Sequence, residues 1–281
     1  MADDLAEQMA ALRPRLHRYA ARMMGSAFDG EDVVQDAMAK LAAEDAEGIE
    51  NVEAWMFKVT HSCAIDALRR RRRQSARDAR AEAGGAANVP ADRRVAVAAA
   101  LATFLRLPPR QRSVVALTDV LGHSIGETAA ILELTEPAVK AALHRARTRL
   151  RELALEETAP AIMTHEQKEQ LQRYADRFNA HDWDALRAML ADDVRLDLVN
   201  RVRISGARDV SVYFTRYQQA PDWHVAPGFA EGRPALLFYS LEAPERPPLY
   251  VVLLDWKEGR IAAIRDFHFA RYVMDALEWQ P

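Results

Sequence analysis

The side chains best suited to chemistry in the first half of the chain are basic, and they occur in two clusters. Arg69 to Arg73 form an unbroken run of five arginines, and the second cluster is Lys140, Arg145, Arg147, Arg149 and Arg151. Arginine binds phosphate groups through a planar fork of N–H donors, which makes nucleic-acid binding one interpretation. A run of charge is also typical of a solvated helix end, and the clusters taken alone favour that simpler interpretation.

The positions of the histidines and of the single cysteine disfavour metal and cysteine chemistry. The histidines are scattered along the chain without HxxH or HExxH spacing, so we expect no metal site and no cofactor. A single cysteine, Cys63, excludes a disulfide framework and a cysteine-built zinc site within one chain. It is expected to be a small core residue rather than a redox switch.

The length and composition indicate a globular protein of more than one domain. The 281 residues are enough for two or three domains, and about half of them are apolar. No run of eighteen apolar residues and no signal-peptide core is present, so the sequence predicts a cytoplasmic protein without a membrane partner. The charge is uneven, because residues 1–155 carry a net charge of +2 and residues 156–281 carry −5.

Apolar residues at helical spacing predict the elements that carry the first basic cluster. Helices are expected over 4–28, 30–43 and about 52–73. Residues 77–94 contain no aromatic residue and include Gly84-Gly85 and Pro90, which predicts a flexible linker. Helical patterning resumes at 95 and continues in short pieces to about 154.

The second basic cluster lies on a predicted helix-turn-helix. Ser124 with Glu127 has the spacing of a capping box at the start of one short helix. Thr135 is a cap candidate for the next, which has Pro137 in its first turn. The second helix would bury an apolar row and leave Lys140, His144, Arg145 and Arg147 to project towards DNA. An ordinary helical hairpin with a basic face fits this spacing equally well.

Three blocks together resemble the extracytoplasmic-function sigma factors of bacterial RNA polymerase. They are DGEDVVQDAMAKL (29–41), VEAWMFKVTHSCAIDALRRRRR (52–73) and LPPRQRSVVALTDVLGHSIGETAAILELTEPAVKAALHRARTRLREL (107–153), in the family's order and separation. The resemblance implies a helical domain over 1–76 that binds the polymerase clamp and melts the minus-ten element. It also implies the linker at 77–94 and a second helical domain over 95–156 that reads the minus-thirty-five element.

The resemblance also assigns roles to individual residues. The positions that would contact the polymerase are Asp32, Val33, Gln35 and Asp36. Those that would face promoter DNA are His61, Ser62, Asp66, Arg69, Arg70 and Arg71 in the first domain, with Glu136, Ala138, Lys140, Ala141, His144, Arg145 and Arg147 in the second. Three places depart from the family pattern: His61-Ser62, Ala141-Ala142 and Glu133 in place of the usual turn glycine. Alanines offer bases only apolar contact, so a different or weaker promoter preference is expected.

Residues 164–281 have another character. Two amphipathic helices are followed by two strands, a further helix over GARDVSVYFTRY and then three or four more strands, which predicts an α+β domain. With the opening FNAHDWDALRAMLADDVRL, this order resembles the SnoaL-like, ketosteroid-isomerase-like cone fold. The fold class expected for the whole chain is therefore two all-α sigma domains followed by an α+β cone.

Catalysis in that fold class relies on a carboxylate or histidine in an apolar pocket. The candidates are Asp197, His224, Tyr239, Asp266 and His268. Asp266 and His268 are expected to share one face of a strand, opposite Phe267 and Phe269. A purely interacting domain is favoured over a small-molecule sensor, and a sensor over an enzyme.

Two functions from different classes remain. One is a sigma factor, with RNA polymerase core and promoter DNA as partners, regulated by its C-terminal domain through intramolecular contact or ligand sensing. The other is a DNA-binding regulator fused to a ketosteroid-isomerase-like enzyme or ligand-binding domain. Residues 29–73 favour the first, because a plain repressor needs neither a clamp-binding nor a melting helix.

Overall fold

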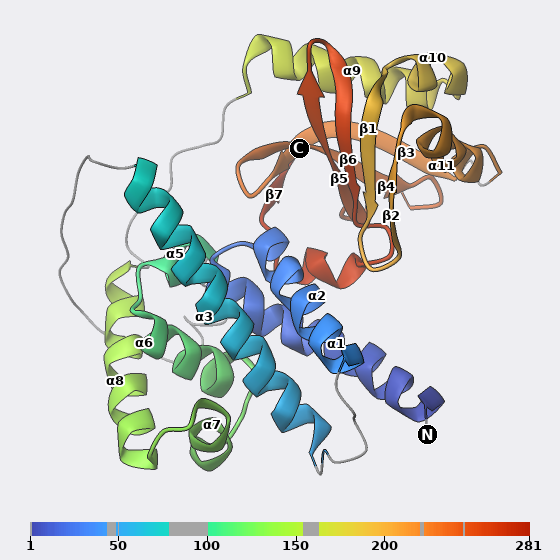
Figure 1. The fold of residues 1–281 in the computed structure, drawn as a ribbon. Helices are drawn as coiled ribbons and strands as arrows, with labels where there is room; N and C mark the ends of the chain where they lie inside the picture. The colour runs from blue at the N-terminus through green and yellow to red at the C-terminus, as the bar shows by residue number, and fades with distance from the viewer. Residues whose placement is uncertain are drawn as a thin grey trace. The chain divides into compact units, whose positions relative to one another are not determined.

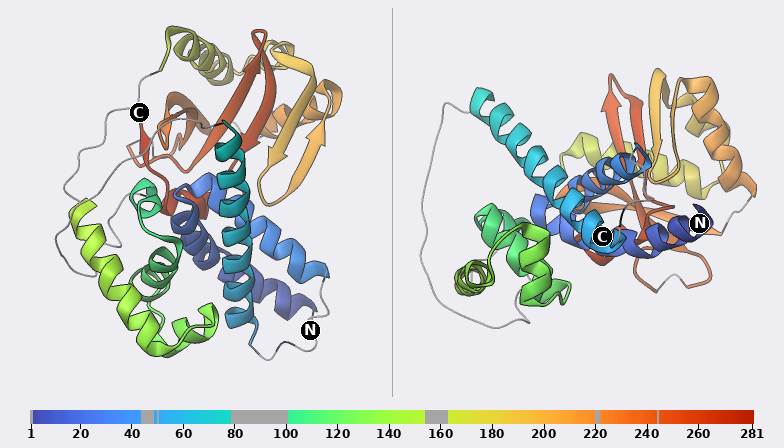
Figure 2. Two further views of the ribbon diagram at one scale, coloured as in Figure 1. Left: turned by 60° about the vertical axis from the view of Figure 1, so that its left-hand side comes forward. Right: turned by 60° about the horizontal axis from the view of Figure 1, so that its bottom comes forward.

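The structure is a computed structural model that describes residues 2–43, 49, 51–78, 101–153, 163–219, 222–243 and 245–281. The chain divides into two compact units, Met1–Thr158 and Ala159–Pro281. The first is built from helices, and the second combines helices with one sheet (Figures 1 and 2). No helix among the described residues is long and apolar enough to cross a membrane.

Three long helices begin the first unit: α1 (Ala2–Met24), α2 (Ala27–Ala43) and α3 (Val52–Asp78). Gly25 has a φ of +70°, a conformation that glycine adopts without strain, and it separates α1 from α2. Gly30 lies where the two helices cross, since a Cβ there would sit 2.5 Å from the backbone nitrogen of Ala21. Both glycines therefore allow α2 to pack closely against α1.

The second group of helices in this unit begins at residue 101. It consists of α5 (Leu101–Leu105), α6 (Pro109–Val115), the π-helical turn η2 (Ala116–Val120), α7 (Ile125–Leu132) and α8 (Glu136–Leu153). The predicted capping box is confirmed, because the Glu127 amide donates to Ser124 Oγ at 3.2 Å and the Ser124 amide donates to Glu127 Oε2 at 2.7 Å. The turn between α7 and α8 contains Glu133 in the left-handed conformation, with a φ of 53°.

The two groups of helices share a hydrophobic core. Ala116, Leu117 and Ile131 are buried in the same cluster as residues of α1, α2 and α3. A second cluster, centred on Phe104 and the inner face of α8, lies within the later group. Of the predicted linker 77–94, residues 77 and 78 belong to α3, and the remainder lies outside the described residues.

A seven-stranded sheet forms the centre of the second unit. Its strands are β1 (Leu190–Leu198), β2 (Val202–Ser205), β3 (Trp223–Ala230), β4 (Arg233–Ser240), β5 (Tyr250–Lys257), β6 (Arg260–Asp266) and β7 (Trp279–Gln280). They lie in the order β2-β1-β6-β5-β4-β3-β7; β1 and β6 pair in parallel, and the other neighbouring strands described here pair antiparallel.

Three helices accompany the sheet: α9 (His165–Asn179), α10 (Trp183–Ala188) and α11 (Ala207–Gln219), with the short η3 (Arg271–Asp275) near the end of the chain. Phe178 of α9 packs against both α11 and the sheet, because its ring centroid lies 5.0 Å from that of Tyr217 in α11 and 5.2 Å from that of Phe238 in β4. The predicted fold class, helical domains followed by an α+β domain, is confirmed. One detail was wrong: β6 ends at Asp266, so His268 and Phe269 lie after the strand and strand alternation does not place them.

Candidate functional sites

Helix α2 presents acidic side chains to solvent. Asp32 and Asp36 are exposed, and Gln35 is half-buried with its Nε2 donating to Glu31 Oε1 at 3.4 Å. Val33, which was grouped with them, is 2% exposed and packs in the core. The acidic part of the outward face of α2 therefore consists of the two aspartates with Gln35 beside them, and Lys40 is exposed further along the helix.

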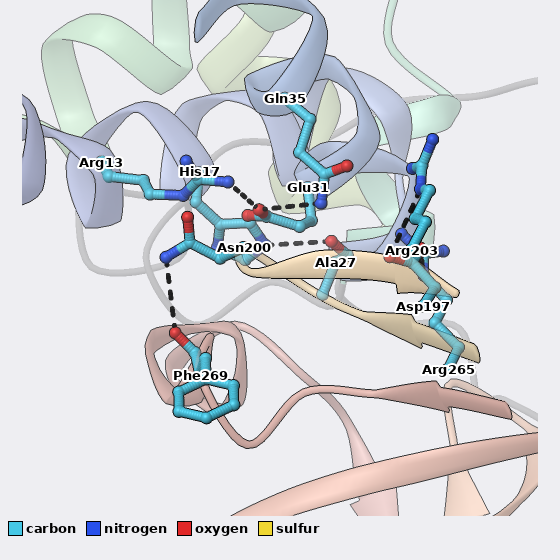
Figure 3. Close-up of polar contacts among 10 residues, drawn as sticks. All are labelled: Arg13, His17, Ala27, Glu31, Gln35, Asp197, Asn200, Arg203, Arg265 and Phe269. Atoms are coloured by element: carbon cyan, nitrogen blue, oxygen red, sulfur yellow. Dashed lines mark hydrogen bonds and ion pairs between the residues drawn. The ribbon is translucent and has the colours of Figure 1, made fainter. Parts of the chain in front are cut away.

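A buried polar cluster fixes α2 against α1 (Figure 3). Arg13 Nη2 donates to Glu31 Oε1 at 2.5 Å, and the side chain of Glu31 is fully buried. His17 Nε2 donates to the Ala27 carbonyl at 2.9 Å. Burial lowers the pKa of His17, although the nearby Glu31 carboxylate opposes this effect. These bonds set the angle at which Asp32 and Asp36 are displayed.

The arginine run at the end of α3 is exposed and interacts with the acids of α2. Arg70 lies 3.5 Å from Asp36, and Arg71 Nη1 donates to Asp29 Oδ2 at 3.0 Å. Exposed ion pairs contribute only about 0–1 kcal/mol, so both arginines can exchange these partners for phosphates.

The other predicted minus-ten residues lie along the same helix. Asp66 and Ser62 are exposed, and Asp66 accepts a hydrogen bond from Arg69 at 3.3 Å. The ring of His61 is half-buried, with Nδ1 2.7 Å from the Tyr19 hydroxyl. Burial lowers the pKa of His61, which favours the neutral ring.

Helix α8 exposes one row of side chains and buries the opposite one. Lys140, Ala141, His144 and Arg145 are exposed, Ala138 is half-exposed, and Lys140 lies 3.4 Å from Glu136. The buried row is Val139, Ala142, Leu143, Ala146 and Leu150. The amphipathic pattern thus leaves the amino-terminal half of α8 open to a large partner.

Arg147 differs from its neighbours on α8. Its Nε and Nη2 donate to the two carboxylate oxygens of Asp119 at 2.8 and 2.7 Å. Asp119 lies in η2, and its side chain is 1% exposed. The guanidinium of Arg147 therefore anchors α8 to η2, a role that the sequence did not reveal.

Contacts between α3 and the later helices complete the first unit. The ring of His123 packs edge-on at 4.8 Å from that of Phe57, and Lys58 Nζ lies 2.6 Å from Glu133 Oε1. Arg112, 3% exposed, donates to the carbonyls of Met23, Leu105 and Leu107. Helix α3 is therefore in contact with the segment before α7, through His123, and with the turn after α7, through Glu133.

The second unit contains a pocket of about 380 Å³ lined by Leu198, Tyr213, Arg216, Tyr217, Trp223, Asp266, His268, Phe269 and Arg271. It includes two of the five predicted pocket residues, Asp266 and His268. Asp266 is 1% exposed, and burial raises the pKa of its carboxyl group.

Hydrogen bonds satisfy the Asp266 carboxyl group within the protein. Oδ2 accepts from the hydroxyls of Tyr213 at 2.8 Å and Tyr217 at 3.0 Å, and Oδ1 accepts from the His268 amide at 2.7 Å. The hydroxyls of Tyr217 and Tyr250 are 3.0 Å apart, which extends the network. Burial raises the pKa of all three tyrosines, so they remain phenols.

The other three predicted pocket residues do not line this pocket. Asp197 lies 3.4 Å from Arg203 and 3.7 Å from Arg265 (Figure 3). His224 and Tyr239 are cross-strand neighbours on β3 and β4, with ring centroids 6.4 Å apart. Alternation along β3 places His224 on the face opposite Trp223, which does line the pocket.

Sequence reasoning missed the two arginines of the pocket. Arg216 lies on α11 between Tyr213 and Tyr217, whose four-residue spacing puts both phenols on one helix face. That spacing could have indicated a polar pocket face on α11, next to which Arg216 lies. Arg271 could not have been found in this way, because its position depends on the turn after β6. Among the described residues, no group of three or more histidines, cysteines or carboxylates is arranged to hold a metal ion.

Family models agree with the architecture. They match sigma-70 region 2 over residues 9–74, sigma-70 region 4 over 98–150 and a SnoaL-like domain over 171–264. The ECF RNA polymerase sigma factor SigM of Mycobacterium tuberculosis is 34% identical over 151 residues, which cover 50% of this chain and 71% of SigM. SigG, from the same organism, is 23% identical over 94% of this chain and 81% of its own length.

One solved structure matches this chain over nearly the full length of both proteins. The crystal structure of the extracytoplasmic function sigma factor SigJ from Mycobacterium tuberculosis is 21% identical, with a TM-score of 0.38, and the match covers 93% of this chain and 95% of SigJ. The helix-turn-helix unit, the three matched regions and the relationship to SigM define the class. The chain belongs to the ECF RNA polymerase sigma factors and has a SnoaL-like domain in its C-terminal part.

Proposed function

We propose that this chain binds the core of RNA polymerase through α2 and contacts promoter DNA through α3 and α8. The observation that carries the proposal is the exposed row of α8, which follows a capped α7 and a tight turn, the arrangement that places a helix in the major groove. The exposed arginines of α3 supply a second basic surface for the DNA backbone. The family to which the chain belongs supports both assignments.

The polymerase-binding surface is tested by reversing its charge. Asp32→Arg with Asp36→Arg should abolish co-purification of the full chain with core polymerase, because an acidic face suits a partner surface of opposite sign. Glu7→Arg, which changes an exposed acid on α1, is the matched control and should bind as the unchanged chain does. Retained binding by the double variant would refute the assignment of α2.

We further propose that the C-terminal domain is a non-catalytic regulator of the helical unit. Its Asp266, the buried carboxyl group of the pocket, is bonded to three internal donors, which suits structure better than proton transfer. In vitro transcription with excess core polymerase compares the full chain with fragment 1–160, whose folding is checked by circular dichroism. A difference of about tenfold, a coupling of about 1.4 kcal/mol, is expected. Equal activity over a range of salt would remove the regulatory role.

A further inference from the structure

The pocket of the second unit has aromatic and aliphatic walls. Trp223 and Phe269 line it together with Leu198, and so do the two phenols bonded to Asp266. A volume of about 380 Å³ lies at the lower end of the range for small-molecule sites. Such walls favour a ligand whose apolar part is a single aromatic ring or two fused aromatic rings.

Two arginines give the pocket positive charge. Arg271 stacks over Trp223, with its Cζ 5.5 Å from the ring centroid, and its Nε donates to the His268 carbonyl at 3.2 Å. These contacts orient the guanidinium, and within the described part of the chain its two terminal nitrogens have no hydrogen-bond partner. Among the described residues neither Arg271 nor Arg216 forms an ion pair with a carboxylate. A bidentate anion is the natural partner for such a fork.

The acid in the pocket lining does not cancel this charge. Asp266 is the acidic lining residue, its oxygens are occupied by internal donors, and its burial raises the pKa of the carboxyl group. Two guanidinium groups therefore face at most one carboxylate. The balance favours a negatively charged ligand over a neutral or cationic one.

His268 supplies one more polar group. Burial, together with Arg271 and Arg216, lowers its pKa to about 4, so the ring is neutral at pH 7. Its Nδ1 is buried and has no hydrogen-bond partner among the described residues. A buried polar atom of this kind is stabilised when a ligand provides a partner.

We propose that this pocket binds a small aromatic carboxylic acid. The ring system lies against Trp223 and Phe269, the carboxylate is held by Arg271 and Arg216, and a polar atom of the ligand bonds to His268 Nδ1. An effect of the ligand on transcription would require the regulatory role proposed above. Binding of the ligand to the pocket does not depend on that role.

The experiment uses the full chain and two probes of matched shape. Isothermal titration with 2-naphthoate is compared with 2-naphthalenemethanol, which has the same rings and no charge. We expect 2-naphthoate to bind at least tenfold more tightly. Arg271→Gln should reduce that preference, because it weakens binding of 2-naphthoate more than binding of the alcohol. Arg208→Gln, an exposed arginine on α11 outside the pocket, is the control and should retain the preference.

Equal affinity for the two probes, or no binding of either at millimolar concentration, would overturn the proposal. So would an unchanged preference in Arg271→Gln, provided that its thermal melt matches that of the Arg208→Gln control. The two hypotheses fail separately. Naphthoate binding with equal transcription by the full chain and fragment 1–160 removes only the regulatory role, and a transcription difference without naphthoate binding removes only the ligand.

Discussion

Arg145 and Arg147 lie two residues apart on α8, yet the same substitution should affect different properties of the protein. Arg147 is bonded through two nitrogens to Asp119, and Arg145 is exposed with no ion pair among the described residues. We therefore expect Arg147→Gln to reduce stability and Arg145→Gln to reduce DNA affinity.

The magnitude follows from burial. Removing one partner of a buried pair costs about 3–5 kcal/mol, because the remaining charge stays buried. Here the Asp119 side chain is 1% exposed but that of Arg147 is 37% exposed. Solvent screening of the Arg147 guanidinium reduces the expected loss to about 2–3 kcal/mol. For a protein of this size the melting temperature of the helical unit should fall by roughly 4–12 °C.

The assays are thermal melting with hydrogen exchange of peptides from 109–153, and promoter binding by the reconstituted holoenzyme at several salt concentrations. Arg147→Gln should melt early and lose protection in this segment. Arg145→Gln should melt normally and lose about one unit of salt slope if one phosphate contact is removed. A normal melt for Arg147→Gln with a reduced salt slope would refute the reasoning, because Arg147 would then contact DNA rather than Asp119.

Three further outcomes are expected. Arg112→Met should lower the melting temperature, because the carbonyl of Met23 and two others lose their donor at about 1–3 kcal/mol each, and a melt within 1 °C of the unchanged chain would contradict this. Ser124→Ala should cost about 0.5–2 kcal/mol in urea unfolding through loss of the capping box, whereas Ser62→Ala, an exposed serine within α3, should change little. The lowered pKa of His268, about 4, means that the unfolded chain binds more protons between pH 6.5 and 4. The stabilisation that neutral His268 gives to the folded chain is therefore complete above pH 6.5 and is lost as the pH falls through 4. The melting temperature of His268→Gln should consequently fall less between pH 6.5 and 4 than that of the unchanged chain. An equal fall in both proteins would contradict the lowered pKa of His268.

Local patterns predicted local structure well. The spacing of Ser124 and Glu127 predicted a cap that the structure contains, and Asp182 caps α10 by accepting from the Ala185 amide. Apolar periodicity likewise predicted the long helices, but it extended the first to residue 28, whereas α1 ends at Met24 and α2 begins at Ala27. These features depend on neighbours within one turn, which the sequence displays directly.

Features that depend on distant partners were not accessible. The Arg147–Asp119 pair joins two elements 28 residues apart, and no local rule distinguishes Arg147 from Arg145. Strand alternation holds within β6, but the prediction applied it to residues beyond the end of the strand at Asp266. Alternation was therefore the wrong reason for placing His268 on the same face as Asp266. Both residues nevertheless line the pocket, because the turn after β6 folds back over Asp266 through the His268 amide.

The shared core of the first unit has a consequence for synthesis. Ala116, Leu117 and Ile131 complete the cluster of α1, α2 and α3, so the apolar surface of these helices is covered only when the later segment has been made. At about 5–20 residues per second, residue 131 follows residue 78 by roughly 3–10 s. During that interval the nascent helices expose apolar side chains that chaperones can bind. Chains ending before residue 116 are accordingly expected to aggregate, and their recovery with a chaperone supplied during translation measures this dependence.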